Sequence, residues 1–446
     1  MSTTTSSGLV KQQLLLAVEV SRQQLAALAE SLPDSLDGLA DAEQLVRQGV
    51  LEVGRSLLQA WSESADCQTA TPECEQCQEA MRHKGYVQGP LVTTLGNLRV
   101  RRARFRCEYC GAESYPQDAC LRFLEHAVSW PLAKVIGRLG AQMPFAQACQ
   151  NLLADYGVVL SKQSVQTICE NAGLALLEDE DRERVKFMSL PVAERAAALP
   201  DSAIYPEKAY VFGDGTMIHA AGDWHEIRVA SVAATDAQDA SLAVDHRARF
   251  LSCEDFGWQL LVLARRTGYH HAKLRAFIAD GARWLWEVAA AQFPDAVQIL
   301  DWYHLSEHLH QAAAVLYREG SSEAKGFSQA RLDELWNGRV NETLCALRDL
   351  RKTIRVKSKR ETLRQLIGYL ENNRQRIDYP LYRQLGLRIG SGQVEGACKN
   401  LVGLRCKQAG MRNWTYRGAE GVLRLRAALQ TGRYDELWHP PRKSAA

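Results

Sequence analysis

The 446-residue sequence has no long apolar run, and its net charge is only +2. No segment approaches the roughly 18 consecutive apolar residues that a membrane-spanning helix needs. The start, Met1-Ser2-Thr3-Thr4-Thr5-Ser6-Ser7, lacks the basic and apolar regions of a secretory signal. No solenoid repeat is present, and no low-complexity tract follows the first eight residues. Hydrophobic residues at 46% and charged residues at 24% argue against disordered, collagen-like and coiled-coil classes. We therefore expect a multidomain globular protein of the cytoplasm with no membrane partner.

The small net charge conceals a strong asymmetry along the chain. Residues 331–446 contain 24 Lys and Arg against 11 Asp and Glu, whereas residues 1–330 contain 30 against 41. A basic segment of this density suits a polyanion, and nucleic acid is the first candidate. A solvated helical surface is the simpler alternative.

Cysteine is abundant, and four of the twelve cysteines form two CxxC pairs, Cys74/Cys77 and Cys107/Cys110. Two such pairs joined by β-hairpins supply the four soft ligands of a tetrahedral zinc site. The alternative is a set of reduced thiols, because disulfides are uncommon in the cytoplasm. Three further residues are spare ligands, and six cysteines are read as small hydrophobic residues. The spare ligands are Cys67, His83 and Cys120, and the six cysteines are Cys149, Cys169, Cys253, Cys345, Cys398 and Cys406.

Two N-terminal segments have patterns that suit DNA binding. Residues 99–106 carry five arginines, of which we single out Arg101, Arg102 and Arg104 as candidates to contact phosphates. A charged edge strand that only prevents aggregation is an equal alternative. Residues 145–173 resemble a helix-turn-helix, with Ser161 as the N-cap of the second helix and Lys162 and Gln163 exposed towards DNA.

From residue 209 onward, short apolar runs predict strands at 209–212, 227–234, 247–252, 274–279 and 297–300, with helices near 258–266 and 282–292. This order predicts a mixed sheet covered by helices. Asp214 and Asp280 each follow a strand and precede a glycine. If their strands are neighbours, the two carboxylates face one another and can share a divalent metal.

Glu395, in the first turn of a helix after Gly390-Ser391-Gly392, can supply a third carboxylate. Asp301 and His304 follow the strand at 297–300, where they can support the metal site. Asp301 is also the rival to Asp280 for the second catalytic acid.

As a set, these motifs resemble bacterial insertion-sequence transposases of the DDE class, closest to the ISKra group and more distantly similar to Mutator-like transposases. The resemblance covers about residues 210–430, together with the upstream cysteine pairs. The matching motifs are Gly213-Asp214-Gly215-Thr216, Trp224-His225-Glu226, Ala279-Asp280-Gly281-Ala282 with Trp284 and Trp286, Phe293-Pro294, Asp301 with His304, Gly390-Ser391-Gly392 with Val394-Glu395, Arg405 with Lys407, Gly410-Met411-Arg412, and Leu425-Arg426-Ala427.

The resemblance implies an α/β fold with a ribonuclease H-like catalytic core that contains an all-α insertion. A zinc ribbon and a helical, helix-turn-helix-like region precede the core. The expected domains are a helical N-terminal region (1–65), a zinc ribbon (66–120), a helical DNA-binding region (121–200), the first part of the core (205–304), the insertion (305–388) and the last part of the core with a basic tail (389–446).

The implied reaction is cleavage of transposon ends and transfer of the freed 3′-hydroxyl to target DNA. Asp214, Asp280 and Glu395 would hold Mg²⁺ or Mn²⁺, and the four cysteines would hold Zn²⁺. Arg405, Lys407 and Arg412 are candidates to hold the DNA backbone. The expected partners are double-stranded DNA at the nucleoid and a second copy of the chain, in a homodimer or higher oligomer. A non-catalytic DNA-binding protein and a different ribonuclease H-like nuclease are the competing hypotheses.

Overall fold

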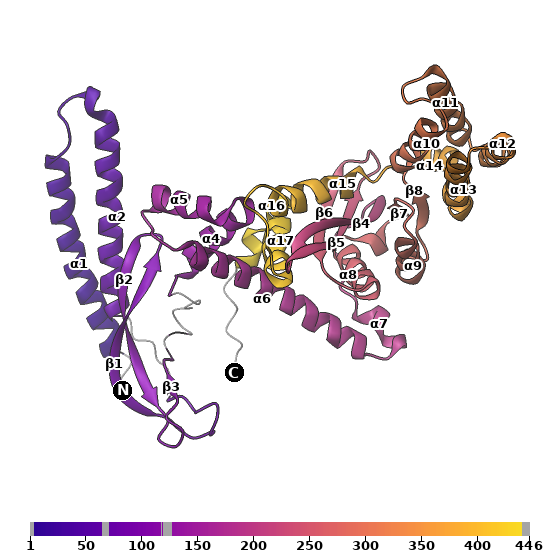
Figure 1. The fold of residues 1–446 in the computed structure, drawn as a ribbon. Helices are drawn as coiled ribbons and strands as arrows, with labels where there is room; N and C mark the ends of the chain where they lie inside the picture. Colours follow the sequence, from indigo (N-terminus) through magenta and orange to yellow (C-terminus); the bar gives the residue numbers. More distant parts are fainter. Residues whose placement is uncertain (1–3, 65–70, 117, 119–126, 439–446) are drawn as a thin grey trace. The chain divides into compact units, whose positions relative to one another are not determined.

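The computed structural model describes residues 4–64, 71–116, 118 and 127–438, and the chain forms two compact units, residues 1–172 and 173–446 (Figure 1). The division falls within one long helix, α6 (Lys162–Ser189), whereas the sequence analysis put a boundary near residue 200. Among the described residues, no helix has both the length and the apolar character needed to cross a bilayer.

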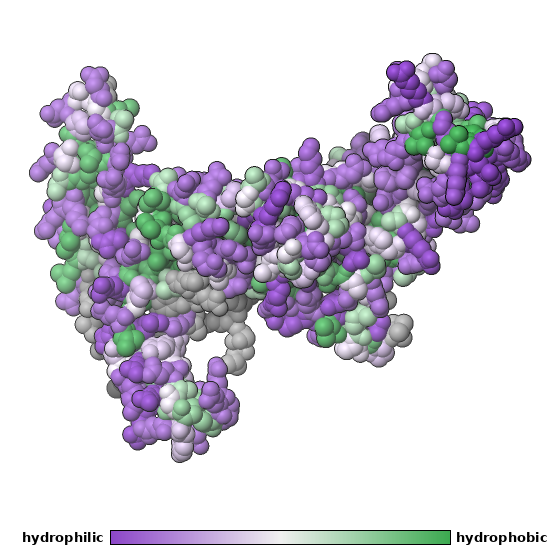
Figure 2. All heavy atoms as spheres, viewed as in Figure 1, coloured by the Kyte–Doolittle hydropathy of each residue, from purple (hydrophilic) through white to green (hydrophobic). Residues whose placement is uncertain are grey.

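The first unit begins with a helical hairpin that packs on a small sheet. Its elements are α1 (Thr4–Glu30), η1 (Leu36–Gly38), α2 (Leu39–Ser64), β1 (Arg82–Thr93), β2 (Gly96–Arg106), β3 (Glu113–Ser114), α4 (Trp130–Gln142), α5 (Phe145–Tyr156) and the first part of α6. Gly49 lets α1 approach α2 closely, since a Cβ there would lie 2.4 Å from Leu28 Cδ2. Leu15, Leu16 and Val50 remain exposed, and hydrophobic residues show on the surface of this hairpin (Figure 2).

The β1–β2 hairpin has a separate small core at each end. Near its turn, Leu91, Leu98 and Val100 pack against Leu58 of α2. The second core lies near the cysteines. It consists of Cys74, Met81, Ala103, Phe105 and Cys107. The twist of a long two-stranded ribbon lets opposite faces become buried at its two ends.

Helices α4, α5 and α6 include the predicted helix-turn-helix. Gly157 ends α5 in the left-handed conformation with φ 64°, and the Ser161 hydroxyl accepts a hydrogen bond from the Ser164 N–H at 3.0 Å, as expected of an N-cap. The second helix is longer than predicted, because α6 continues past Gly173 to Ser189.

The second unit is built on a five-stranded sheet in the order β6-β5-β4-β7-β8. The strands β4, β5 and β6 pair antiparallel, whereas β7 is parallel to both β4 and β8. The sheet elements and the helices between them are α7 (Val192–Ala198), β4 (Lys208–Ala220), β5 (Asp223–Thr235), β6 (Ser241–Arg249), α8 (Cys253–Arg266), η2 (Tyr269–His271), β7 (Leu274–Ala279), α9 (Arg283–Gln292) and β8 (Val297–Leu300).

The strand β4 is longer than its apolar run predicts, which corrects the position of Asp214. This residue does not end the strand but pairs with Val229 inside the β4–β5 ladder. The parallel pairing of β4 with β7 ends earlier, at Phe212, so Asp214 lies just beyond it. Gly215 does not form a turn either. It leaves room for Glu226, whose Oε1 would be 2.3 Å from a Cβ at this position.

After β8 the described chain is helical up to the loop at residue 390. The helices are α10 (Trp302–Leu316), α11 (Ser322–Trp336), α12 (Val340–Thr353), α13 (Lys357–Asn372), η3 (Arg374–Arg376) and α14 (Tyr379–Gln384). The chain then returns to the sheet through α15 (Gly392–Ala397), the π-helical stretch η4 (Cys398–Gly403), α16 (Leu404–Cys406), α17 (Tyr416–Gln430) and η5 (Asp435–Trp438).

A buried ionic network joins α6 and α17 to β6. Arg247 on β6 is 4% exposed and contacts Glu180 at 2.8 Å and Asp245 at 2.7 Å. Glu180 also accepts from Arg424 of α17 at 3.0 Å. Burial raises the pKa of Glu180, but the two arginines outweigh it and bring the value to about 2. Each buried charge in this network therefore has a partner of opposite sign, without which its burial would be strongly destabilising.

Helices α6 and α17 touch at two glycines, and this contact generates the first prediction. A Cβ at Gly173 would lie 1.9 Å from the Gly421 carbonyl oxygen, a backbone atom that cannot rotate away. We expect Gly173→Ala to lower the free energy of unfolding by about 2 kcal/mol or more. Gly326→Ala on α11 is the matched control, because nothing lies within 4 Å of its Cβ position. It should stabilise by roughly 0.5–1 kcal/mol. Urea unfolding of both variants measures this, and equal effects would contradict the close contact.

Candidate functional site

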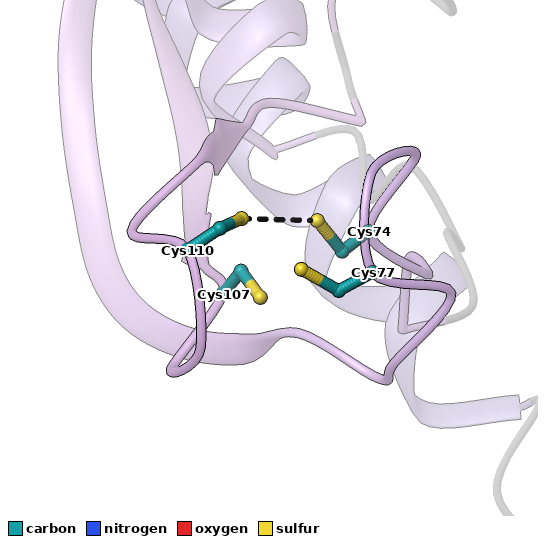
Figure 3. A group of neighbouring side chains, drawn as sticks. All are labelled: Cys74, Cys77, Cys107 and Cys110. Carbon is teal, nitrogen blue, oxygen red and sulfur yellow. Dashed lines mark hydrogen bonds between the residues drawn. The ribbon is translucent and has the colours of Figure 1, made fainter.

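Four cysteines converge at the open end of the β1–β2 hairpin (Figure 3). Their sulfurs all lie within 4.8 Å of one another, and the Cys74 and Cys110 sulfurs are 3.5 Å apart. Four thiols at this spacing can hold a metal ion such as zinc. Cys74 and Cys107 are buried, whereas Cys110 is exposed.

The two cysteine loops have the same backbone design. The Gln78 N–H donates to the Cys74 carbonyl at 2.8 Å, and the Gly111 N–H donates to the Cys107 carbonyl at 3.1 Å. Gln78 and Gly111, each just after the second cysteine of its pair, have φ angles of 57° and 73°. The backbone N–H of Cys110 lowers the pKa of Cys107 to about 7, so this thiol ionises readily, as a metal ligand must.

The spare ligands of the sequence analysis do not join this cluster in the described residues. His83 instead packs edge-on against Phe105 at 5.2 Å. Cys67 and Cys120 lie outside the described residues.

Asp214, Asp280 and Glu395 approach one another from β4, the end of β7 and α15. Burial raises the pKa of Asp214, and the charges of Asp280 and Glu395 raise it further. The charges of Asp280 and Glu395 therefore both act on Asp214, although among the described residues the three acids do not form a group whose ligand atoms all lie within 4.8 Å. Glu395 is exposed and accepts a hydrogen bond from the Ser391 hydroxyl at 3.0 Å.

A thiol contacts the first of these acids. Cys398 Sγ donates to Asp214 Oδ2 at 3.3 Å, and the Gly215 N–H donates to Oδ1 at 2.6 Å. Burial and the Asp214 charge raise the pKa of Cys398, so the thiol keeps its proton. The sequence analysis read Cys398 as an ordinary small hydrophobic residue. Its contact with Asp214 joins residues 184 positions apart in the chain, which no local pattern marks.

Asp280 is held by the helical segment that follows β8. The Tyr369 hydroxyl of α13 donates to the Asp280 carbonyl oxygen at 2.8 Å. Gly281 permits this approach, since its φ is +107° and a Cβ there would lie 2.7 Å from Tyr369 Cε2. The Asp280 carboxylate accepts from the Ala282 N–H at 2.8 Å. Tyr369 was not predicted, because nothing local in its helix marks it.

Asp301, the rival second acid, is a buried N-cap. Its side chain is fully buried, and Oδ1 accepts from the N–H groups of Tyr303 at 2.6 Å and His304 at 3.0 Å. Oδ2 accepts from the Ser391 N–H, so both oxygens are occupied by the backbone. Asp301 therefore fixes the loop that precedes the helix of Glu395.

The His304 side chain, which was expected to support the acids, contacts residues of its own helix. It is 39% exposed, faces Glu307 at 3.8 Å and packs edge-on against His308. His308 lies nearer to the acids. Burial lowers its pKa and His304 adds to this, while the charge of Asp280 opposes the shift.

The basic candidates of the first unit fall into two groups. Arg102 contacts Asp118 through both carboxylate oxygens at 2.9 and 3.0 Å, and Arg104 pairs with Glu113. Both arginines are therefore engaged within the unit. Arg101 is exposed and lies over the Tyr86 ring at 3.7 Å. Lys162 and Gln163 are exposed in the first turn of α6, as expected.

The basic candidates of the second unit differ from one another. Arg405 is 1% exposed and lies over the ring of Trp414 at 4.7 Å, so its side chain belongs to the core and not to a DNA-facing surface. Lys407 Nζ donates to Thr216 Oγ1 at 2.6 Å, two residues from Asp214. Arg412 is exposed.

Comparisons with known proteins add no assignment: no protein-family profile matches the chain, and no curated protein matches its sequence.

The cysteine cluster generates the second prediction. Cys107→Ser should remove nearly all of the thiolate-to-metal charge-transfer band that Co²⁺ gives with the wild-type chain, because three sulfurs and a hydroxyl bind the ion far more weakly. The measurement is a Co²⁺ titration followed by absorption. Cys345→Ser is the control, since Cys345 is an exposed cysteine of α12. A band that survives Cys107→Ser unchanged would contradict the four-cysteine site.

The raised pKa of Asp214 generates the third prediction. Because the folded protein holds the Asp214 proton more strongly than the unfolded chain does, the contribution of this group to stability falls as pH rises through the interval between its unfolded and folded pKa values. Ionised Asp214 is therefore destabilising at pH 7. Asp214→Asn should raise Tm at pH 7 without added divalent ions.

This gain should disappear below the ordinary aspartate pKa of about 3.9, where Asp214 is protonated in both states. Thermal unfolding of the wild type and of Asp214→Asn, at pH 7 and again below a pH of about 3.9, measures the gain in Tm. Asp223→Asn, at an exposed carboxylate of β5, should change Tm little. A gain of equal size at both pH values would show that charge is not its cause.

Proposed function

We propose that the chain is a DDE transposase, which cleaves transposon ends and joins the freed 3′-hydroxyl to target DNA. The observation that carries the proposal is that the charges of Asp280 and Glu395 both act on Asp214, although up to 181 residues of chain separate the three acids. No side-chain nucleophile is needed for such a reaction, since water or a DNA hydroxyl attacks the phosphate.

The order of the elements supports a ribonuclease H-like core. Asp214 lies on the first strand of the second unit's sheet, Asp280 follows its fourth strand, and Glu395 lies on a helix after the helical segment 302–384. This is the arrangement that the resemblance to DDE transposases implies. We extend the proposal to that segment as the all-α insertion.

The donor set of the acidic cluster suits a hard divalent cation. Mg²⁺ and Mn²⁺ prefer oxygen ligands, and Asp214, Asp280 and Glu395 offer three carboxylates. Burial raises the pKa of Asp214 most, and the charges of Asp280 and Glu395 add a repulsion that a bound cation would relieve. Such an ion would supply Lewis-acid stabilisation of charge on the reacting phosphate oxygens. Cys398 orients Asp214, Asp301 fixes the loop before Glu395, and Tyr369 holds the Asp280 backbone.

The helices α12 and α13 carry a cationic hollow that suits a DNA backbone. Five cations and one acid line it, and the surface in this part of the second unit is strongly hydrophilic (Figure 2). The charged residues are Arg348, Arg351, Lys352, Arg360, Arg364 and Glu371. Phosphate contacts of this kind add affinity without sequence preference.

In the first unit, Lys162, Gln163 and Arg101 are the exposed members of the predicted DNA-binding set. We propose that the exposed start of α6 contacts the terminal sequence, as a recognition helix does. We also propose that zinc at the four cysteines fixes the hairpin that presents Arg101.

The fourth prediction concerns cleavage. With Mg²⁺ or Mn²⁺, the full chain should nick the 3′ ends of a labelled duplex taken from the DNA that flanks its coding sequence. Asp214→Asn, Asp280→Asn and Glu395→Gln should each reduce cleavage on the order of 100-fold or more, as expected when a group that acts in the transition state is removed. Gel analysis of the labelled strands gives the rates.

The controls are Asp223→Asn and Glu307→Gln, which change exposed carboxylates outside the cluster. Both should cleave at nearly the wild-type rate. Binding without any cleavage would favour a non-catalytic DNA-binding protein. Cleavage without strand transfer to a second duplex would favour another nuclease. Loss of cleavage in Asp301→Asn but not in Asp280→Asn would make our second acid wrong.

A further inference from the structure

A second group of metal-ligating side chains lies outside both sites described above. Asp201 comes from the loop between α7 and β4, and His270 and His271 form part of η2 between α8 and β7. The two histidine Nε2 atoms lie 2.6 and 2.9 Å from the same oxygen, Asp201 Oδ1. His271 Nε2 also lies 3.1 Å from the Ser202 carbonyl oxygen, a contact that a bound ion would replace. One potential ligand atom of each residue lies within 4.8 Å of the others.

Contacts that do not involve these ligand atoms hold the two segments together. Arg265 Nε donates to the Pro200 carbonyl at 3.3 Å, and the Ser202 hydroxyl donates to the Arg266 carbonyl at 3.1 Å. A Cβ at Gly268 would lie 2.3 Å from the Ile204 carbonyl oxygen, so only glycine permits this approach. The scaffold therefore fixes the segments on either side of the cluster independently of it.

The histidine rings are also oriented by their neighbours. Tyr205 stacks on His271 with ring centroids 4.2 Å apart and an interplanar angle of 24°. Arg275 donates to the His270 carbonyl at 2.8 Å, which fixes the backbone of η2. Ligands that are held in place before binding lose little entropy when an ion arrives.

Burial and charge suit a cation on the solvent side of the pair. The side chains of His270 and His271 are 15% and 22% exposed, whereas Asp201 is 76% exposed. Burial lowers the pKa of His270, which favours the neutral ring that binds metals. The hydrogen bond from His270 and those from Ser202 and His271 hold the pKa of Asp201 at about 2, so the carboxylate stays ionised.

We propose that Asp201, His270 and His271 form a second metal site, which takes one divalent transition-metal ion of the Zn²⁺ or Co²⁺ type and leaves a position open to water. Imidazole is a borderline ligand that suits these ions better than Mg²⁺, and a carboxylate oxygen commonly completes such zinc sites. Metal–ligand distances near 2.0–2.1 Å imply ligand atoms about 3.3 Å apart. The exposed carboxylate must therefore move outward by about half an ångström.

The site would cross-link the starts of the two parallel strands that lead to Asp214 and Asp280. The first pair of β4 and β7 is Lys208 with Leu274, and the Leu274 N–H donates to the Glu207 carbonyl at 3.0 Å. An ion bound by residues 201 and 270–271 would tie the chain just before both strands. This role does not depend on the proposed DNA chemistry.

The test is a Co²⁺ titration of the metal-free full chain, followed by absorption and by elemental analysis. The wild type should bind two equivalents: one with a thiolate charge-transfer band, and one with only the weaker visible bands of nitrogen and oxygen ligands. Cys107→Ser should abolish the charge-transfer band and retain the second set of bands. Asp201→Ala and His271→Ala should each retain the charge-transfer band and lose the second set of bands. His310→Ala, at an exposed histidine of α10, should change neither.

A wild-type chain that binds cobalt only through thiolates overturns the proposal. So does a second set of bands that survives both Asp201→Ala and His271→Ala. Because Cys107→Ser leaves the proposed site intact, its titration decides the matter even if the other two variants fold poorly. Absence of the nitrogen and oxygen bands in Cys107→Ser, with far-UV circular dichroism like that of the wild type, is a negative result for the site.

Discussion

The buried carboxylate of Asp301 is the interaction on which the second unit most depends. It caps α10 through the N–H groups of Tyr303 and His304, and it accepts the N–H of Ser391, which lies 90 residues later. The Trp302 N–H donates to the Ile389 carbonyl at 2.9 Å beside it. The two ends of the helical segment 302–384 are therefore tied together where residues 301–302 contact residues 389–391. A buried N–H left without its acceptor costs about 1–3 kcal/mol, and here the loss would also release the turn before Glu395.

Two buried acids of the second unit, Glu180 and Asp214, have pKa values shifted in opposite directions. Glu180 lies among arginines, which bring its pKa to about 2, so its charge contributes to the packing of α6 and α17 on β6. Asp214 is also largely removed from water, yet its charged neighbours include two further acids, and its pKa is raised. Lys407, the basic residue that reaches this region, bonds to Thr216 and not to the carboxylate. Negative charge held at a cost in stability is typical of a functional site.

Local signals in the sequence predicted some elements well. The strands β7 and β8 were correct at both ends, because each is a short apolar run between polar residues and turns. The spacing of the CxxC pairs predicted the sulfur cluster, since the chemistry of that site is local to two loops. The strand β4 was underestimated. Its later part mixes polar and apolar residues and is held by the antiparallel ladder with β5, which a search for apolar runs does not detect.

The roles of the two rival acids could not be separated from the sequence, because Asp280 and Asp301 each directly follow a strand. The contacts that distinguish the two acids come from residues distant in the chain. The Ser391 N–H donates to the Asp301 carboxylate, and the Tyr369 hydroxyl donates to the Asp280 backbone carbonyl. The partners of Arg102 and Arg405 are nearer in the chain, Asp118 and Trp414, but no spacing pattern in the sequence marks either pair.

Helix α13 forms part of the surroundings of Asp280 and is not an appendage that only adds charge. Gly281 has no side chain, so Tyr369 can pack over it and donate to the Asp280 carbonyl, while His308 packs against the Tyr369 ring at 4.3 Å. Burial raises the pKa of Tyr369, and the Asp280 charge adds to this, so its hydroxyl remains a donor at neutral pH. The position of Asp280 is therefore set by a helix that begins 77 residues later in the sequence. It follows that substitutions in the packed face of α13 should affect the surroundings of Asp280, whereas substitutions on its cationic face should affect the DNA binding that we propose for that face.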